Sequence, residues 1–222
     1  TDTYRHGDFP VKKGDRLLGT RVIPLVIAKE KMEQVKKTAG ETPLVSLTPY
    51  KKKTVGIVTT GNEVYYGRIK DTFTPVIIEK MKEYKIEVCG HIVCNDDMEK
   101  ITKAILELKE KGAEMIVCTG GMSVDPDDKT PGAIKATGAR IVSYGAPVLP
   151  GAMFLLSYLE DGTPVMGLPG CVMYAKATVF DLVLPRIAAG IEVTKKDLAH
   201  MGNGGFCLGC KECHYPNCHF GK

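Results

Sequence analysis

Short apolar runs alternate with amphipathic stretches along most of the chain after residue 54. Residues 55–58 and 115–118 are continuous apolar runs, which is typical of strands buried on both faces of a sheet. Residues 86–93 predict a further strand. Apolar positions at helical spacing predict a helix on either side of that strand; they are Ile77, Met81 and Tyr84, then Met98, Ile101, Ile105 and Leu108. Strands that alternate with helices favour a parallel or mixed sheet covered on both faces.

Capping residues mark where the predicted helices begin. Thr74 followed by proline marks the first helix, and Asp96 with Glu99 three residues on resembles a capping box for the second. Thr130 is predicted to cap a third helix, because Pro131 suits the first helical position.

A hairpin is predicted near the end of this region. Residues 153–159 and 164–168 flank an Asp-Gly pair, which favours a tight turn between antiparallel strands. The turn at residues 167–170 then leads into a helix predicted over 174–189. The sheet should therefore contain at least one antiparallel pair.

Residues 1–50 form a separate β-containing region in which prolines interrupt the pattern. Residues 21–28 predict an edge strand broken by proline, and residues 30–38 predict a short helix. Because the chain starts at Thr1 and this region has no obvious partner, we interpret it as part of a truncated upstream domain.

Composition and charge exclude some classes of function. The 222 residues carry a net charge of +4, and the basic residues are scattered without interleaved aromatics, so nucleic-acid binding is not indicated. No apolar run approaches the roughly 18 residues of a membrane span, and no signal peptide is recognisable. Four of the eight cysteines lie in or beside apolar runs, as buried reduced thiols of a cytoplasmic protein do; they are Cys89, Cys94, Cys118 and Cys171.

The strand at 115–118 runs into a corner, residues 119–131, that combines paired glycines with three aspartates. In parallel sheets such corners lie at the carboxyl ends of strands, where ligands bind. Gly120 and Gly121 let backbone amides approach an anionic group. The aspartates would repel a bare phosphate, which favours a phosphate with a metal ion, or a polyol. The alternative is an ordinary acidic loop before a capped helix.

Four blocks of sequence, at residues 59–63, 95–97, 119–131 and 167–170, stand in an order that resembles the molybdopterin-binding domain of molybdenum-cofactor biosynthesis proteins. The resemblance covers about residues 54–192. It implies a three-layer α/β/α domain, whose sheet we expect to be mostly parallel with an antiparallel hairpin, and a homo-oligomer, either a dimer or a trimer. Two enzymes share this domain, molybdopterin adenylyltransferase and molybdopterin molybdenumtransferase.

The resemblance also implies roles for individual residues. It assigns catalysis to carboxylates that hold Mg²⁺ against a phosphate; they are Asp128, Glu63 and either Asp96 or Asp97, of which Asp97 is preferred. It assigns molybdopterin binding to residues of the turns; they are Thr60, Gly61, Gly120, Gly121, Ser123, Pro169 and Gly170. The expected partner is thus a small pterin or nucleotide ligand.

The chain departs from the family pattern at several positions. Asn62 stands where the molybdenumtransferase usually has aspartate, and Cys171 stands where it has asparagine. Residues 72–73 replace a Ser-Asn pair, and residues 125–126 replace a Gly-Asp pair. These changes are compatible with pterin binding and leave catalysis open.

Three functions remain open at this point. The first is transfer chemistry, with molybdate inserted into adenylylated molybdopterin in the manner of the molybdenumtransferase. The second is a carrier or sensor that binds molybdopterin without turnover. The third is a nucleotide pyrophosphatase domain of the competence-damage type, whose ligand would be a dinucleotide such as ADP-ribose.

The last residues, 202–222, form a glycine-rich tail with four cysteines in twelve positions; they are Cys207, Cys210, Cys213 and Cys218. Thiolates at such spacing are typical of an iron–sulfur cluster or of Zn²⁺. His214 or His219 could replace one thiolate in a zinc site. The alternatives are disulfides or free thiols. The two biosynthetic enzymes do not ordinarily carry such a tail.

Overall fold

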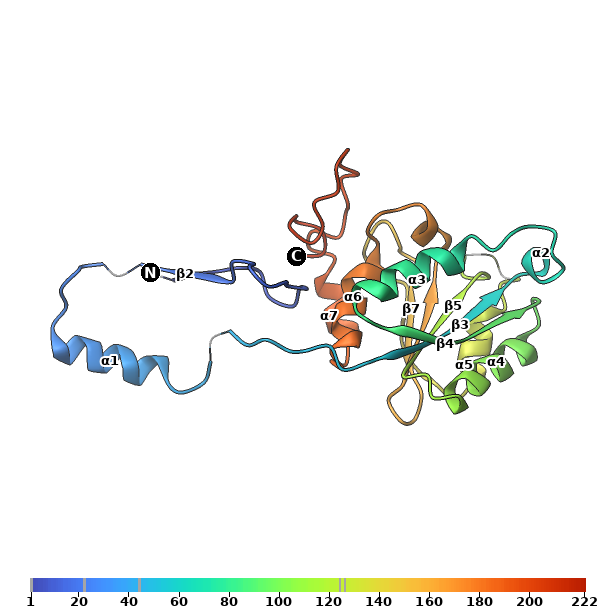
Figure 1. Ribbon diagram of the computed structural model, residues 1–222, viewed down its shortest axis with the longest axis horizontal. Helices are drawn as coiled ribbons and strands as arrows, with labels where there is room; N and C mark the ends of the chain where they lie inside the picture. Colours follow the sequence, from blue (N-terminus) through green and yellow to red (C-terminus); the bar gives the residue numbers. More distant parts are fainter. Residues whose placement is uncertain (1, 22, 44, 124, 126) are drawn as a thin grey trace. The chain divides into compact units, whose positions relative to one another are not determined.

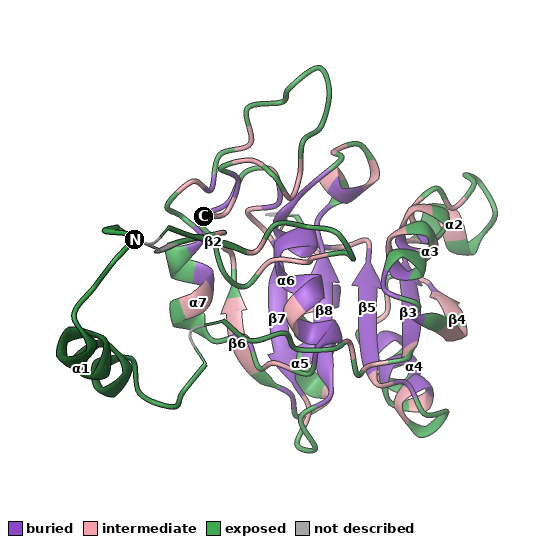
Figure 2. Ribbon diagram, turned by 60° about the vertical axis from the view of Figure 1, so that its left-hand side comes forward, coloured by how far each residue is buried: buried purple, intermediate pink, exposed green. Residues whose placement is uncertain are grey.

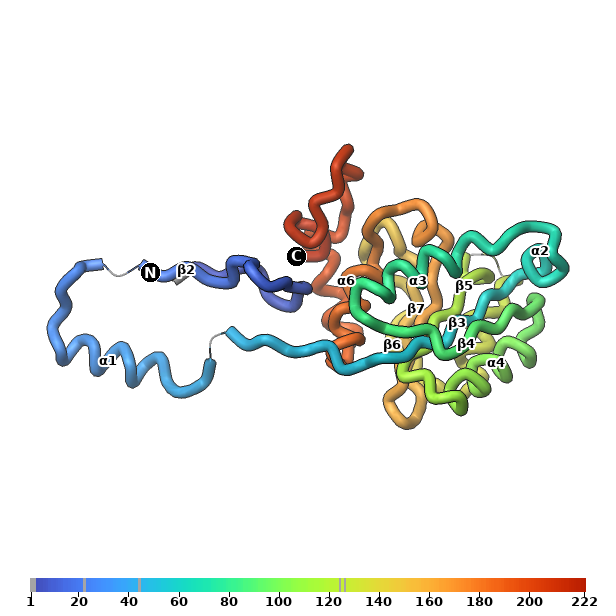
Figure 3. Tube along the Cα trace, in the orientation of Figure 1, coloured from blue at the N-terminus to red at the C-terminus, as the bar shows by residue number. Residues whose placement is uncertain are grey.

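The computed structural model describes residues 2–21, 23–43, 45–123, 125 and 127–222. The chain divides into two compact units, Thr1–Pro49 and Tyr50–Lys222, and Figure 3 traces the path of the backbone within each. None of the described helices is long and apolar enough to cross a membrane.

The first unit contains little regular structure. Strands β1 (Asp2–Tyr4) and β2 (Leu18–Thr20) form an antiparallel pair, and helix α1 (Lys29–Ala39) confirms the helix predicted over 30–38. No residue of α1 is buried.

The strand predicted over residues 21–28 is wrong at every position that the structure describes, and Val22 lies outside the described residues. Residues 23–26 form bends instead. Pro24 has no amide hydrogen to donate to a neighbouring strand, and Leu25 is 95% exposed. The apolar run therefore gains nothing from burial that would hold it in a sheet.

The second unit is built on a six-stranded mixed sheet in the order β4-β3-β5-β8-β7-β6 (Figure 1). Its strands are β3 (Thr54–Thr60), β4 (Glu87–Cys94), β5 (Met115–Thr119), β6 (Arg140–Tyr144), β7 (Leu155–Tyr158) and β8 (Pro164–Leu168). β4, β3, β5 and β8 run parallel, whereas β7 pairs antiparallel with both β8 and β6. The mostly parallel sheet with a β7–β8 hairpin confirms the prediction.

Helices cover both faces of this sheet and complete the predicted three layers (Figure 1). They are α2 (Asn62–Tyr65), α3 (Phe73–Glu83), α4 (Met98–Glu110), α5 (Thr130–Ala136), the 3₁₀-helix η1 (Gly170–Met173), α6 (Val179–Ala188) and α7 (Lys195–His200). α4 and α5 pack on one face, and α3 and α6 lie on the other. Figure 2 shows β3, β5, β7 and β8 buried between the layers, as their apolar sequences require.

The predicted cap of α4 is wrong by one residue. Asp97, not Asp96, caps α4, since its Oδ1 accepts hydrogen bonds from the amides of Glu99 (3.0 Å) and Lys100 (3.1 Å). Asp96 instead accepts from the amide of Asn62 at 3.0 Å. The two neighbouring aspartates therefore have different roles: Asp97 caps the helix, and Asp96 holds the turn after β3.

The starts of three further helices also differ from the prediction. Thr130 is the first residue of α5, not its cap. α3 begins at Phe73, because the carboxylate of Asp71 accepts from the first amides of that helix. α6 begins at Val179 and not at residue 174, because Thr178 and Asp181 form a reciprocal capping box there.

Candidate functional site

The carboxyl ends of the four parallel strands meet at one edge of the sheet, so the four sequence blocks are brought together there. The chain passes from β3 to β4 on one side and then crosses to β5 on the other. The order of strands therefore reverses between β3 and β5. In open α/β sheets ligands bind at such a reversal, outside the carboxyl ends of the strands.

A glycine turn that follows β5 lies at this reversal. Gly120 and Gly121 have φ values of +85° and +52°, a region that residues with a side chain rarely adopt. A Cβ on Gly120 would overlap the carbonyl oxygen of Thr60, and one on Gly121 would lie 2.9 Å from Oγ1 of Thr130. Neither glycine amide donates to an acceptor in the described part of the chain. The turn thus offers two backbone donors that have no acceptor among the described residues.

Two buried threonines hold the glycine turn in place. The hydroxyl of Thr60 donates to the carbonyl of Thr119 (3.1 Å), and that of Thr130 donates to the carbonyl of Gly120 (2.9 Å). The two hydroxyl oxygens lie 3.0 Å apart. Among the predicted binding residues, Thr60 therefore uses its hydroxyl inside the protein. Gly61 likewise donates its amide to the carbonyl of Cys94.

The acidic loop after the glycines brings Ser123 and Asp128 together. Oδ2 of Asp128 accepts from the amide (2.6 Å) and the hydroxyl (2.7 Å) of Ser123. Tyr144 on β6, a residue that the sequence did not single out, donates its hydroxyl to the carbonyl of Ser123 at 2.9 Å. Burial raises the pKa of Tyr144, and the nearby charge of Asp128 adds to that shift. Val124 and Pro126 of this block lie outside the described residues.

The remaining predicted carboxylates are not assembled into one cluster. Glu63 is exposed on the short helix α2, and Asp97 is occupied as the cap of α4. Wherever the structure describes the chain, it gathers no three His, Cys, Asp or Glu side chains that could hold a metal ion. This holds for the carboxylates and equally for the tail cysteines, so both metal assignments stay predictions.

The turn after β8 contributes a second stretch of backbone to the same edge. Pro169 is buried, and Gly170 is exposed with open space where a Cβ would stand. Burial raises the pKa of the Cys171 thiol, as does the charge of Asp181, and both disfavour the reactive thiolate.

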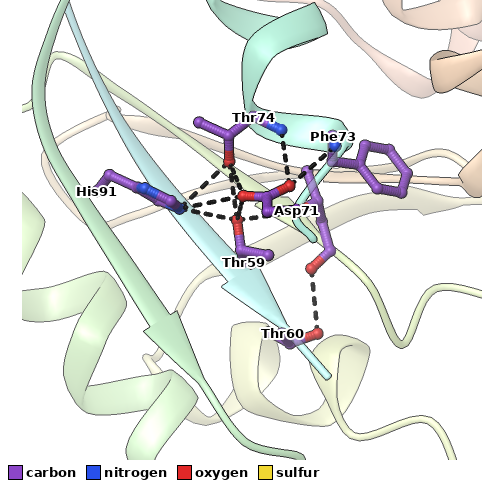
Figure 4. Close-up of polar contacts among 7 residues, drawn as sticks. Thr59, Thr60, Asp71, Phe73, Thr74 and His91 are labelled. Carbon is purple, nitrogen blue, oxygen red and sulfur yellow. Dashed lines mark hydrogen bonds and ion pairs between the residues drawn. The ribbon is translucent and has the colours of Figure 1, made fainter. Parts of the chain in front are cut away.

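A polar cluster beneath α3 was missed by the sequence reasoning (Figure 4). The carboxylate of Asp71 accepts from the hydroxyl of Thr74 at 2.5 Å, and His91 Nε2 lies 3.7 Å from the same oxygen. The imidazole also contacts the hydroxyls of Thr59 (2.9 Å) and Thr74 (3.2 Å). The cluster ties the loop after α2 to β3 and β4.

The Asp71 cluster predicts a pH-dependent loss of stability. Burial raises the pKa of Asp71, but hydrogen bonds from Thr74 and Phe73 and the nearby His91 outweigh it, so the folded pKa lies below 3.8. The ionised carboxylate stabilises the fold above that pH, and the stabilisation is lost as the pH falls through the folded pKa.

We expect Asp71→Asn to lower the free energy of unfolding by about 1 kcal/mol at neutral pH, with the difference shrinking below pH 3.8. Urea unfolding across pH checks this, with the exposed Asp127→Asn as the matched control. An Asp71→Asn deficit that persists unchanged at low pH would contradict the account.

The profile of one protein family, described as "Probable molybdopterin binding domain", matches residues 56–189. The chain belongs to this family. All four turns of the site begin within the matched residues, so the molybdopterin-binding domain and the strand edge described above are the same part of the chain.

Known proteins with related sequences are matched over only part of their own length. A CinA-like protein of Mycobacterium avium is 35% identical over 75 residues, which is 34% of this chain and 17% of that protein. A molybdopterin molybdenumtransferase of Synechococcus elongatus is 24% identical over 190 residues, 81% of this chain and 45% of that protein. The chain thus matches less than half the length of these relatives.

Solved structures share the fold. The molybdopterin biosynthesis enzyme MoaB of Thermus thermophilus covers 62% of this chain and 97% of its own, with a TM-score of 0.50 and 22% identity. The protein CinA of Thermoplasma acidophilum covers 61% of this chain and 98% of its own, with a TM-score of 0.50 and 20% identity. At this level of identity the likeness concerns the fold.

Proposed function

We propose that the carboxyl edge of β3, β5 and β8 binds molybdopterin, with the phosphate of the pterin at the Gly120–Gly121 turn. One observation carries the proposal: the turn is built on two glycines at positive φ, and the described chain offers no acceptor for their amides. Backbone amides arranged in this way bind anionic groups. The position at the reversal of strand order supports the same site.

We further propose that Mg²⁺ accompanies the phosphate. Mg²⁺ is commonly held by one or two carboxylates together with the phosphates of the substrate, so a preformed cluster of three acidic residues is not required. Asp128 supplies a carboxylate a few residues from the glycine turn, and Glu63 supplies an exposed one after β3. Asp97 would have to leave the cap of α4, at a cost of about 1 kcal/mol, so it is the weaker ligand.

For the reaction, we propose transfer chemistry of the molybdenumtransferase type, in which AMP leaves adenylylated molybdopterin as molybdate is inserted. The metal, when bound, would offset the charge of the phosphate. The chain's own contribution is positioning. The glycine turn orients the phosphate, and the Ser123–Asp128 pair holds a carboxylate beside it, with Tyr144 fixing the loop from β6.

The test of the transfer proposal is Asp128→Asn. We expect the gain in affinity for adenylylated molybdopterin that Mg²⁺ provides to fall about tenfold, and AMP release to fall with it. Titrations and AMP assays with and without EDTA measure both. Asp127→Asn, at the exposed residue next to Asp128 in the same loop, is the control and should behave like the unmodified protein. Unchanged turnover in Asp128→Asn would remove Asp128 from the mechanism.

A second candidate function is a molybdopterin carrier or sensor without turnover. The observation that favours it is the loss of carboxylates from the site: Asn62 replaces an aspartate, Asp96 is tied to its amide, and Asp97 caps α4. Saturable binding of adenylylated molybdopterin with no AMP release in the presence of Mg²⁺ and molybdate would establish this function. Hydrolysis of ADP-ribose without affinity for the pterin would instead favour the function of a nucleotide pyrophosphatase. The 75-residue match to a CinA-like protein is the reason to include this test.

A further inference from the structure

The eight cysteines differ in how far they are buried: two are buried, two are exposed and four are intermediate. Cys94 and Cys118 are buried in the core, and burial raises the pKa of both thiols, so packing explains them. Cys210 and Cys213 in the tail are exposed, and all four tail thiols are free. Unpaired cysteines are among the residues most often found inside proteins. Packing therefore does not explain why the tail carries four of them.

The tail leaves the fold at a fixed point. The amide of Leu149 donates to the carbonyl of Gly205 (2.7 Å), and the amide of Cys207 donates back to Leu149 (2.8 Å). This parallel bridge attaches the start of the tail to the segment between β6 and β7. The first of the four thiols is thus held directly beside an ordered part of the chain.

The tail also returns to a fixed point. Gly221 donates its amide to the carbonyl of Gly204 at 2.8 Å, so the two ends of the tail meet. Phe220 is 1% exposed, and the hydroxyl of Tyr215 donates to the carbonyl of Asp181 on α6 at 2.6 Å. Residues 207–218 therefore form a loop closed at both ends, and much of the entropy cost of bringing the four thiols together is already met by these contacts.

Between these anchors the loop has no regular structure to prevent it from closing further. Residues 207–214 are neither helix nor strand, and Gly209 has a φ of +62° with open space around it. Figure 1 shows the loop projecting from the fold beyond α6 and α7, and in Figure 2 most of it is exposed. It can therefore contract around a ligand without displacing the core.

We propose that Cys207, Cys210, Cys213 and Cys218 close around a single soft metal centre, held by four thiolates. Zn²⁺ and a [4Fe–4S] cluster share this chemistry, since each accepts four cysteine ligands at short spacing. Binding converts thiols to thiolates and releases their protons to solvent. The centre lies outside the molybdopterin site and does not depend on the function proposed for it.

The test is metal analysis of the full chain purified without oxygen, with zinc, iron and acid-labile sulfide measured per chain. We expect either about one Zn²⁺, or about four irons with a matching amount of sulfide and a visible absorption band. Cys210→Ser and Cys213→Ser each remove one thiolate ligand and should lose most of the metal. Because both side chains are exposed, we expect these replacements to leave the fold intact. Cys171→Ser, outside the tail, is the matched control and should keep the metal.

Two results would overturn the proposal. One is a chain that holds less than about a tenth of an equivalent of either metal, even after incubation with Zn²⁺ or with iron and sulfide under reducing conditions. The other is metal that survives in Cys210→Ser and Cys213→Ser at the level of the Cys171→Ser control. Titration of free thiols before and after reduction shows whether a metal-free protein has its tail cysteines in disulfides; a rise in free thiols on reduction would identify a disulfide-bonded tail.

Discussion

Gly120→Ala is expected to lower the free energy of unfolding by about 2 to 4 kcal/mol and to abolish molybdopterin binding. Its φ of +85° strains any residue with a side chain. The added Cβ would also overlap the carbonyl oxygen of Thr60, which is backbone and cannot swing aside. Relief requires β3 and β5 to separate at the point where the ligand is proposed to bind. Urea unfolding and a binding titration on the same preparation measure both effects.

Gly162→Ala is the matched control for that prediction. Gly162 lies in the β7–β8 hairpin with a φ of +81°, nearly that of Gly120, but no atom lies within 4 Å of the position of its Cβ. The control therefore carries the backbone strain without the overlap, and should cost about 1 kcal/mol with ligand binding unchanged. Equal losses in the two variants would show that the contact with Thr60 does not matter.

Asp181→Ala is expected to lower the free energy of unfolding by about 3 to 4 kcal/mol, because it breaks an ion pair that is largely removed from water. Asp181 Oδ1 lies 2.5 Å from Nζ of Lys80, and the two side chains are 12% and 14% exposed. Oδ2 also accepts from the amide of Thr178 at 2.7 Å, which caps α6. The variant leaves the lysine ammonium without its carboxylate and the amide of Thr178 without its acceptor, so half of the capping box of α6 is lost.

Two further variants separate these contributions. Asp181→Asn keeps an acceptor for the cap but loses the charge, so it should fall between the unmodified protein and Asp181→Ala. Glu79→Ala breaks the pair of Glu79 with Lys82 on the surface of α3, where the side chains are 71% and 64% exposed, and should change stability by less than about 0.5 kcal/mol. A loss in Asp181→Ala as small as that in Glu79→Ala would contradict the assignment.

Much of the fold follows from the sequence because burial leaves a clear pattern. The continuous apolar runs at β3 and β5 predicted strands covered on both faces, and the Asp-Gly pair predicted the β7–β8 hairpin. The strand predicted over residues 21–28 was wrong because burial is missing in the described part of this segment. An apolar run looks like a strand in the sequence, but the described residues of this run are exposed.

The exact role of each acidic residue could not be predicted in the same way. Asp96 and Asp97 are adjacent and chemically identical, and only the direction in which the chain leaves β4 decides which of them caps α4. A carboxylate reads the same in the sequence whether it caps a helix or faces a ligand. Asp97 and Thr60 were predicted to face a ligand, but in the structure both side chains have hydrogen-bond partners within the protein.

The Asp71–His91 cluster could not be predicted because it depends on strand register. His91 pairs with Ile57 across the parallel β3–β4 ladder, and this register places its imidazole beside Thr59. Twenty positions separate Asp71 from His91 in the chain, and no spacing rule links them. A histidine next to a cysteine-containing apolar run gave no signal until the strands were paired.

The most direct test of the central claim is an equilibrium titration of the full chain with molybdopterin under anaerobic conditions, with ADP-ribose as the rival ligand. The account predicts saturable binding of the pterin at one site per chain, retained in Gly162→Ala and lost in Gly120→Ala. Absence of pterin binding by the folded, unmodified protein, or saturable binding of ADP-ribose in its place, would contradict it.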